Sequence, residues 1–232
     1  MVDPPNSRGY AGVTSIFGIT AFILMWVGSI RCNFIKFPVS ASTAVNDDLS
    51  TDVSMQLGLW YFEWLSLLFN PNGTYLFESC NGYPEGVKMD AAWKAARAFS
   101  VLAFILGCFM LVASCVSVCS SQHPGYYLTY VWESPMYLLT ALCQGLTLLM
   151  LSSNACDSFV LTELGINFPE SERVSFAQTC SLSTGAKVNI SAMSMWAAAG
   201  ILSFLAHRSE RKEMAEEMVD ADLQEPLAPA EA

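Results

Sequence analysis

The stretch FSVLAFILGCFMLVASCVSVC, residues 99–119, decides the class of this protein. It contains no charged side chain, and about 20 apolar residues in a helix are enough to cross roughly 30 Å of hydrocarbon. Ser120, Ser121 and Pro124 follow it, and proline cannot continue a helix without losing a backbone hydrogen bond. The sequence therefore predicts a transmembrane helix at residues 99–119.

Three further apolar stretches are long enough to span a membrane: residues 12–30, 135–151 and 188–206. The alternative for the third is a helix extended back to Leu128 through Trp132. Four spans place the two terminal segments, residues 1–11 and 207–232, on the same side as the short connection 120–134. The two longer loops, residues 31–98 and 152–187, then lie on the opposite side. A cleaved signal peptide is the alternative for residues 12–30, but that apolar run exceeds the usual 7–15 residues and Asp3 precedes it.

The composition agrees with a membrane protein. Of 232 residues, 53% are hydrophobic and only 14% are charged, whereas a soluble domain carries about 25% charged residues. Such hydrophobicity excludes disorder over most of the chain. A net charge of −10 argues against nucleic-acid binding, which requires a basic face. The expected partner is the lipid bilayer, and no nucleic acid is expected.

Two signals disagree about which side of the membrane the loops face. Four of the eleven Lys and Arg residues lie on the terminal side and seven on the loop side, which by the positive-inside rule orients the loops inward. Cysteines indicate the reverse, because Cys32, Cys80, Cys156 and Cys180 all fall in the loops and paired loop cysteines are typical of an oxidising compartment. The triplet beginning at Asn72 is a glycosylation acceptor on the same side. We therefore expect extracellular or lumenal loops, cytoplasmic termini, and a plasma-membrane or secretory-pathway location.

The first long loop has the pattern of a small β-sheet. Residues 32–39, 53–64 and 74–80 are rich in β-branched and aromatic side chains. Residues 70–73, Asn-Pro-Asn-Gly, are typical of a tight hairpin turn. Because so small a sheet is only marginally stable alone, we expect a disulfide to stabilise it. Four loop cysteines allow three pairings; we favour Cys32–Cys80 and Cys156–Cys180, each closing one loop, with a reduced, buried Cys32 as the alternative.

A helix is expected to begin before the second span. Asp90 is a suitable N-cap, and the alanines that follow favour helix. Lys94 and Arg97 fall on this first stretch, and the simplest interpretation of both is that they extend to the headgroup level.

After Lys212 the chain turns acidic. The fourth helix is expected to continue to about residue 223, before Pro226 and Pro229, with a solvated cytoplasmic tail beyond it.

A short set of residues resembles a known family. Gly58-Leu59-Trp60 in a large first loop, followed by Ala-Arg97-Ala at the entry to the second span, is similar to the claudin and peripheral-myelin-protein superfamily of four-span proteins. The resemblance implies an all-α transmembrane four-helix bundle with a small extracellular β-sheet cap. The chain departs from claudins in lacking two cysteines soon after Gly-Leu-Trp; the next one is Cys80. It also ends in Ala232 rather than in a large hydrophobic residue.

No chemistry of catalysis is visible in the sequence. The two histidines, His123 and His207, do not form a metal-site pattern, and no phosphate loop or nucleophile elbow occurs. We therefore expect no enzyme activity, no catalytic or metal residues and no cofactor.

The expected function is structural, adhesive or that of an accessory subunit, with homo-oligomers or other membrane proteins as partners. The alternative is an oligomeric pore or transporter lined by Thr140, Gln144 and Thr147, although Gln144 more simply hydrogen-bonds a neighbouring helix. The small-residue pairs Ala103/Gly107 and Ala141/Gly145 fit either homo-oligomer contacts or contacts within one bundle.

Overall fold

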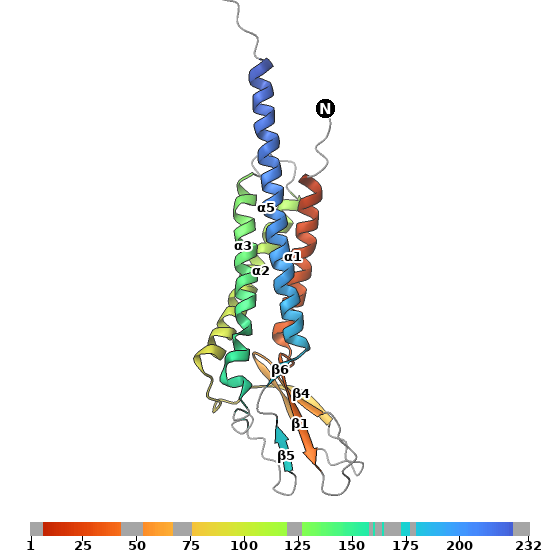
Figure 1. The fold of residues 1–232 in the computed structure, drawn as a ribbon, viewed down its shortest axis with the longest axis vertical. Helices are drawn as coiled ribbons and strands as arrows, with labels where there is room; N and C mark the ends of the chain where they lie inside the picture. The colour runs from red at the N-terminus through yellow and green to blue at the C-terminus, as the bar shows by residue number, and fades with distance from the viewer. Residues whose placement is uncertain are drawn as a thin grey trace, which may run out of the picture.

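The computed structural model describes residues 7–42, 53–66, 76–119, 127–157, 160, 164, 173–176 and 180–224. It has four long helices, α1 (Ser7–Ile30), α2 (Ala91–Cys119), α3 (Tyr127–Leu146) and α5 (Thr184–Gln224). Each contains a segment long and apolar enough to cross a membrane: Gly12–Ile30, Ala91–Val116, Trp132–Ser152 and Thr184–Ser209. The four helices run side by side, and the start of α1 and the end of α5 lie at the same end of the bundle (Figure 1). The prediction of a multi-pass membrane protein with four apolar helices is confirmed.

The helices are longer than the apolar stretches in the sequence. The helix α2 begins at Ala91, and the Asp90 carboxylate accepts a hydrogen bond from the backbone N–H of Trp93 at 2.9 Å, so the predicted N-cap is confirmed. The helix α5 continues to Gln224, as expected from the prolines that follow. The α-helical part of α3 ends at Leu146, and the 3₁₀ helices η1 (Thr147–Ser152) and η2 (Asn154–Cys156) follow it.

The start of α3 agrees with the extension of the third span back to Leu128 rather than with a start at Pro135. The helix starts at Tyr127, and Pro135 lies inside it. Proline removes one helical hydrogen bond, which packing against a neighbouring helix compensates in membrane proteins. Next to this proline, the Ser134 hydroxyl donates to the Gly200 carbonyl at 2.9 Å and so links α3 to α5. Glu133, two residues before this proline, is buried within α3.

An antiparallel sheet lies at the opposite end of the bundle from the start of α1 (Figure 1). We call this sheet the cap; its strands are β1 (Ile35–Ser42), β2 (Val53–Leu57), β3 (Tyr61–Ser66), β4 (Leu76–Gly82), β5 (Arg173–Phe176) and β6 (Ser181–Leu182). The strand order is β4-β3-β2-β1-β5, with β6 also paired to β1. The prediction of four apolar helices with a small sheet is thus confirmed.

Two features of the sheet differ from the sequence expectation. The predicted strand at residues 53–64 is two strands, because the chain turns at residues 58–60 and β2 pairs with β3 through Leu57 and Phe62. The second loop, for which no strand was predicted, contributes β5 and β6. Val39 of β1 faces Phe176 of β5, and Ile35 faces Leu182 of β6. The expected hairpin turn at residues 70–73, including Asn72, lies outside the described residues.

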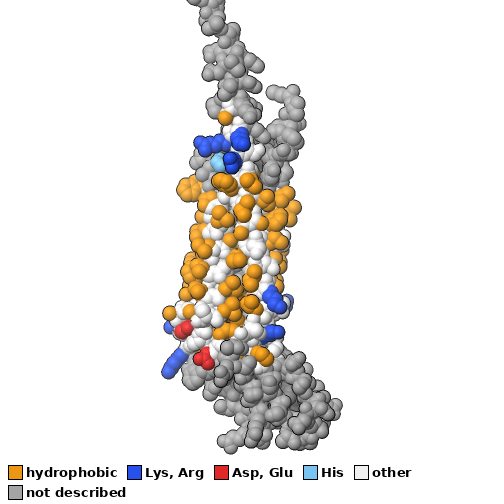
Figure 2. Space-filling model, viewed as in Figure 1, with side chains coloured by type: hydrophobic (Ala, Val, Ile, Leu, Met, Phe, Trp, Pro, Cys, Tyr) orange, Lys and Arg blue, Asp and Glu red, His pale blue; other side chains and the backbone are white. Residues whose placement is uncertain are grey.

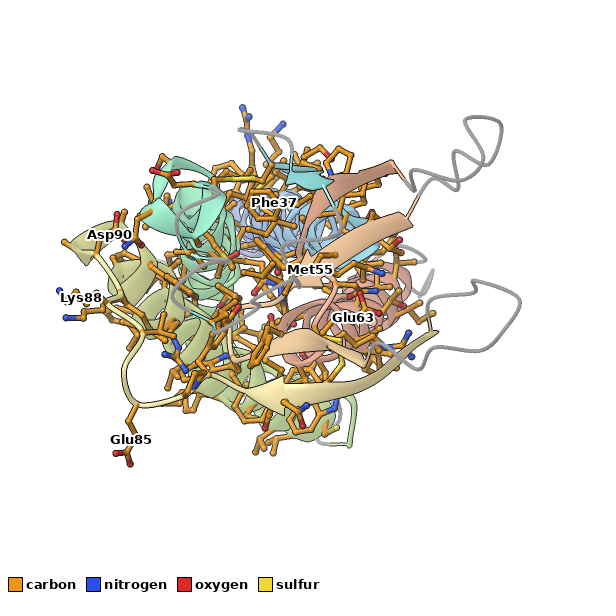
Figure 3. All side chains as sticks on the ribbon, turned by 90° about the horizontal axis from the view of Figure 1, so that it is seen from below. Phe37, Met55, Glu63, Glu85, Lys88 and Asp90 are labelled. Carbon is orange, nitrogen blue, oxygen red and sulfur yellow. A yellow bond between two sulfur atoms is a disulfide. The ribbon has the colours of Figure 1, made fainter. Side chains whose placement is uncertain are left out.

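The cap and the bundle share one hydrophobic core. Phe37 and Met55 of the sheet are buried with Trp93 of α2 and Met150 of η1. Seen from the cap end, Phe37 and Met55 lie over the helices, whereas Glu85 points away from the molecule (Figure 3). Because burial of each large apolar side chain contributes about 1.5–3 kcal/mol, this shared core fixes the cap to the ends of the helices.

The helices approach one another at small residues. A Cβ at Gly28 of α1 would lie 3.0 Å from the Gly185 carbonyl oxygen of α5, and one at Gly107 of α2 would lie 3.1 Å from the side chains of Met25 and Phe22. Ala103 and Ala141 are buried, and Gly145 contacts Met193. The four small residues singled out in the sequence therefore pack within one bundle.

The outer surface of the bundle matches a lipid environment. Hydrophobic side chains cover its middle, and charged side chains gather at both ends of this belt (Figure 2). Large apolar residues on all four helices are exposed there: Ile16, Ile23, Trp26, Ile105, Phe109, Val112, Trp132, Leu142, Ile201 and Phe204. A soluble monomer rarely exposes so many large apolar side chains on one continuous surface.

Candidate functional site

The Gly-Leu-Trp motif forms the turn between β2 and β3, directly against the end of α1. The Gly58 N–H donates to the Tyr61 carbonyl at 2.7 Å. A Cβ at Gly58 would lie 2.3 Å from the Arg31 carbonyl oxygen and 2.9 Å from the Cys32 Cα. Only glycine allows the two backbone segments to approach this closely. Leu59 beside it is fully buried, so the turn is part of the core shared by cap and bundle.

Trp60 and Arg97, both singled out in the sequence, are in contact. The Arg97 guanidinium carbon lies 4.3 Å from the Trp60 ring centroid, the geometry of a cation–π interaction. Its Nη1 also donates to the Met89 sulfur at 2.8 Å. The Arg97 side chain is therefore half-buried against the cap, a contact that the interpretation as a charge extended to the headgroup level did not include. Lys94, one turn earlier, is exposed.

Tyr83 connects this turn to α2 and was missed in the sequence. Its hydroxyl donates to the Gly58 carbonyl at 2.7 Å. Its ring stacks on Phe62 at 5.4 Å and meets Trp93 edge-on at 4.9 Å, both between centroids. Burial raises the pKa of Tyr83, and the nearby Arg97 charge opposes that rise. The phenol is thus a neutral hydrogen-bond donor at neutral pH.

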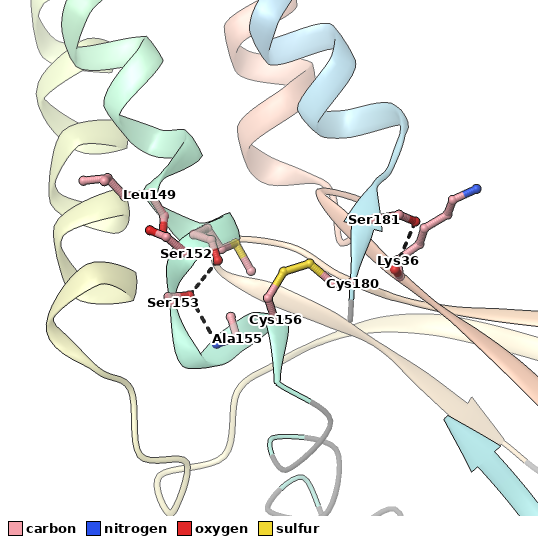
Figure 4. The surroundings of a disulfide bond; sticks show 9 residues. Lys36, Leu149, Ser152, Ser153, Ala155, Cys156, Cys180 and Ser181 are labelled. Carbon is pink, nitrogen blue, oxygen red and sulfur yellow. Dashed lines mark hydrogen bonds between the residues drawn. A yellow bond between two sulfur atoms is a disulfide. The ribbon is translucent and has the colours of Figure 1, made fainter. Parts of the chain in front are cut away.

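Two disulfides join the cap to the helix ends. Cys32, at the end of α1, bonds Cys80 of β4 with a Cα–Cα distance of 5.7 Å. Cys156 of η2 bonds Cys180, just before β6, with a Cα–Cα distance of 5.0 Å (Figure 4). These are the two pairs favoured from the sequence, and Cys32 is not a free thiol in the structure. Each bond restricts the unfolded chain and adds about 2–4 kcal/mol of stability.

Polar contacts join the start of α2 to the second loop. The backbone N–H of Asn154 donates to the Asp90 carboxylate at 3.0 Å, and the Asp90 N–H donates to the Asn154 side chain at 3.3 Å. The Asn154 amide also donates to the Lys88 carbonyl at 2.7 Å. The Ser153 hydroxyl caps η2 by accepting from the Ala155 N–H at 3.2 Å (Figure 4). The second loop is therefore fixed at both the disulfide and the α2 N-terminus.

Glu63 on β3 is a half-buried carboxylate of the cap. Burial raises its pKa, while hydrogen bonds from the backbone and side chain of Gln56 oppose the rise. One of its carboxylate oxygens has no hydrogen-bond partner. Viewed from the cap end, Glu63 lies among the strands, unlike the outward-pointing Glu85 (Figure 3).

A buried polar cluster joins α3 to α5 within the bundle. The Gln144 amide donates to the Asn189 side-chain oxygen, and Asn189 Nδ2 donates to the Thr147 hydroxyl at 2.7 Å and to the Gln144 carbonyl at 3.2 Å. The carbonyl is reached where α3 changes into the 3₁₀ helix η1, a change that frees helical carbonyls for other donors. The prediction that Gln144 hydrogen-bonds a neighbouring helix is confirmed. Thr140 is buried too, and its hydroxyl donates to the Met136 carbonyl at 2.8 Å.

Comparison with known proteins gives no relative: no family model matches the chain, and no curated protein matches it in sequence. Within the described residues, no group of three or more His, Cys, Asp or Glu side chains is placed to hold a metal ion. The site is therefore described by its own geometry, as a junction in which Gly58, Leu59, Trp60, Tyr83 and Arg97 join the cap to α1 and α2.

Proposed function

We propose that this chain is a multi-pass membrane protein with a structural, adhesive or accessory-subunit role, and that its cap is the part that contacts other proteins. The observation that carries this proposal is the rigid attachment of the cap. Two disulfides, the Trp60–Arg97 contact and a continuous core hold the sheet on the helix ends. A preorganised surface loses little conformational entropy on binding a partner.

The proposal includes membership of the claudin and peripheral-myelin-protein superfamily. Its support is that Gly58 packs against the end of α1, Leu59 is buried in the core shared by cap and bundle, and Trp60 contacts Arg97 of α2. It also includes the orientation, with the cap extracellular or lumenal, the termini cytoplasmic and Asn72 glycosylated. Disulfides at the cap support that orientation, because they persist in oxidising compartments.

Transport through an oligomeric pore is the alternative function. Thr140, Gln144 and Thr147, the residues considered for such a path, are fully buried inside a single chain. The Thr140 hydroxyl bonds the Met136 carbonyl, and the Gln144 side-chain N–H and the Thr147 hydroxyl bond Asn189 within that chain, while the Gln144 side-chain oxygen has no partner. A path between chains lined by these residues requires the bundle to open and these hydrogen bonds to break, so the geometry favours the structural role.

Cross-linking at matched positions tests the structural role. A photo-crosslinking amino acid replaces Tyr61, an exposed residue of β3, and in a control chain it replaces Val112, which is exposed on the lipid-facing side of α2. We expect discrete protein adducts from Tyr61 in intact membranes and none of the same mass from Val112. Mixing cells that carry differently tagged chains separates contacts across cells from contacts within one membrane. Monomer alone from Tyr61, with no co-purified protein, contradicts the proposal.

A further inference from the structure

Three cationic side chains are exposed where α5 leaves its apolar segment, which ends at Ser209. They are Arg208, Arg211 and Lys212, and we call them the basic patch. Figure 2 shows Lys, Arg and His side chains gathered on α5 at this end of the hydrophobic belt. Within the part of the chain that the structure describes, none of the three forms a salt bridge. The charge of the patch is therefore available to a partner.

The basic patch continues the lipid-facing side of α5. Ile201, Phe204 and Leu205 are 46–55% exposed within the apolar segment. At 3.6 residues per helical turn, Arg208 and Lys212 fall on the same side of the helix as these three residues, and Arg211 falls next to that side. The patch therefore lies above the lipids whose acyl chains contact α5, rather than against another helix.

The positive charge on the terminal side of the membrane is concentrated in this patch. Three of the four Lys and Arg residues on that side belong to it, and the connection 120–134 contains none. The positive-inside rule counts charges over whole connecting segments, so it does not require them to share one side of a helix. Their common position above the lipid-facing residues is a separate feature, and it favours a ligand in the lipid.

The spacing and chemistry of the patch indicate the headgroup of that lipid. Arg208 and Lys212 lie about 6 Å apart along the helix axis. A guanidinium pairs with phosphate through two parallel hydrogen bonds, and a lysine ammonium binds phosphate as a point charge. A headgroup with several phosphates engages all three cations at once, whereas a headgroup with one net negative charge engages fewer of them.

From this arrangement we propose that the basic patch binds an inositol phospholipid carrying two or more phosphate groups on its ring, with the acyl chains against Ile201 and Leu205. Anionic lipids of this kind belong to the cytoplasmic leaflet, which is the leaflet that the proposed orientation places beside the patch. The inference goes beyond the role proposed for the cap, because it concerns the opposite end of the bundle.

Site-specific photo-crosslinking of the full chain in vesicles tests the proposal. Benzoylphenylalanine replaces Leu205, the vesicles are phosphatidylcholine with a minor fraction of phosphatidylinositol bisphosphate, and intact mass spectrometry identifies the lipid in each adduct. In the control chain it replaces Val116, which is exposed at the end of the apolar segment of α2, in a stretch without Lys or Arg from residue 98 to residue 172. We expect the ratio of phosphoinositide adducts to phosphatidylcholine adducts to be at least about tenfold higher at Leu205.

Neutral variants connect this ratio to the patch. Arg211→Gln is expected to lower the ratio at Leu205 about fivefold, and neutralising all three cations with Gln should lower it to the value at Val116. Lys94→Gln removes the same charge from an exposed site at the cap end of α2 and should leave the ratio unchanged. Peptide mapping of the Cys32–Cys80 disulfide verifies that each variant is folded.

Three results overturn the proposal. The first is an equal ratio at Leu205 and Val116, and the second is equal enrichment of phosphatidylserine supplied at the same total lipid charge. The third is enrichment that appears only after Glu213, Glu216 and Glu217 are replaced by Gln, because the acidic residues that follow the patch are then its occupant. Both leaflets of the vesicles contain the phosphoinositide, so the result is independent of the membrane orientation and of the role proposed for the cap.

Discussion

The guanidinium of Arg97, on the second turn of α2, lies 4.3 Å from the centroid of the Trp60 ring at the β2–β3 turn. The pair joins two segments far apart in the sequence, and it is the most direct link between the motif in the first loop and the second span. Arg97→Met keeps an apolar stem but removes the charge. We expect this substitution to lower the free energy of unfolding by about 1–2 kcal/mol, the value of a desolvated cation–π contact.

The measurement is thermal unfolding of the purified chain in detergent, followed by loss of near-ultraviolet circular dichroism. Lys94→Met is the matched control, because Lys94 is exposed on the same helix. A double-mutant cycle with Trp60→Leu isolates the pair. If Arg97→Met and Lys94→Met unfold at the same temperature, the contact does not stabilise the cap.

Gly58→Ala is expected to be among the most disruptive single substitutions in the chain. Its Cβ would overlap the Arg31 carbonyl oxygen at 2.3 Å, so β2 or the end of α1 must shift, at a cost of about 3 kcal/mol or more. Non-reducing peptide mapping should show a reduced yield of the Cys32–Cys80 bond. Gly82→Ala is the control, since nothing lies within 4 Å of a Cβ there; equal yields from the two variants would contradict the packing at Gly58.

Glu63 makes the stability of the cap depend on pH. Burial raises its folded-state pKa above the ordinary value of 4.5, so the folded chain binds the proton more tightly than the unfolded chain does. The stability contributed by this proton is fully present below the unfolded pKa and is lost as the pH rises through the folded pKa. The cap is thus expected to lose stability as the pH rises from 4 toward neutrality, in addition to the effects of other groups.

Glu63→Gln should abolish this part of the pH dependence and stabilise the cap at pH 7. The gain is expected to be less than about 1 kcal/mol, because water screens a half-exposed carboxylate. Glu85→Gln, on an exposed residue of the same loop, should leave the profile unchanged. Thermal unfolding of the three chains between pH 4 and pH 8 provides the comparison, and parallel profiles for the parent and Glu63→Gln would rule out this role.

The Gln144–Asn189 contact is expected to hold α3 against α5. Asn189→Leu leaves the buried Gln144 amide and Thr147 hydroxyl without this partner and should destabilise the bundle by about 1–2 kcal/mol. The double variant Gln144→Leu with Asn189→Leu removes both amides and should be less destabilised than the sum of the single variants. Unfolding in detergent measures all three, and strict additivity would show that the two side chains act independently.

The elements that rest on strong local patterns could be predicted. Four apolar stretches correspond to the four long helices, Asp90 is the N-cap of α2, and residues 32–39 and 74–80 contain strands β1 and β4, because hydrophobic length and capping are local properties. The two cysteine pairs followed from their positions in separate loops.

Features that depend on distant packing could not be predicted in this way. The break at Gly58 is set by the nearby Arg31 carbonyl, which no local propensity reveals. The strands β5 and β6 contain four and two residues, too few for a periodic signal, and they form only because β1 offers partners. Arg97 was assigned to the headgroup level, because its partner Trp60 lies far away in the chain. The bond between Asn189 and Gln144 could not be predicted from either span alone, because the two residues lie far apart in the chain.

The role proposed for the cap requires that it face an oxidising compartment while the end of α5 faces the cytoplasm. The direct measurement is labelling of intact cells with a membrane-impermeant maleimide, using Glu85→Cys, between β4 and α2 at the cap end, and Arg211→Cys, just beyond the apolar segment of α5 that ends at Ser209, with the unsubstituted chain as background. The proposed orientation predicts that Glu85→Cys reacts at once and that Arg211→Cys reacts only after permeabilisation. For a chain held in an internal membrane, the same reagents are applied to sealed vesicles whose cytoplasmic face is outward, and the expected order is reversed. In intact cells, labelling of Arg211→Cys with protection of Glu85→Cys would contradict the orientation and the role proposed for the cap.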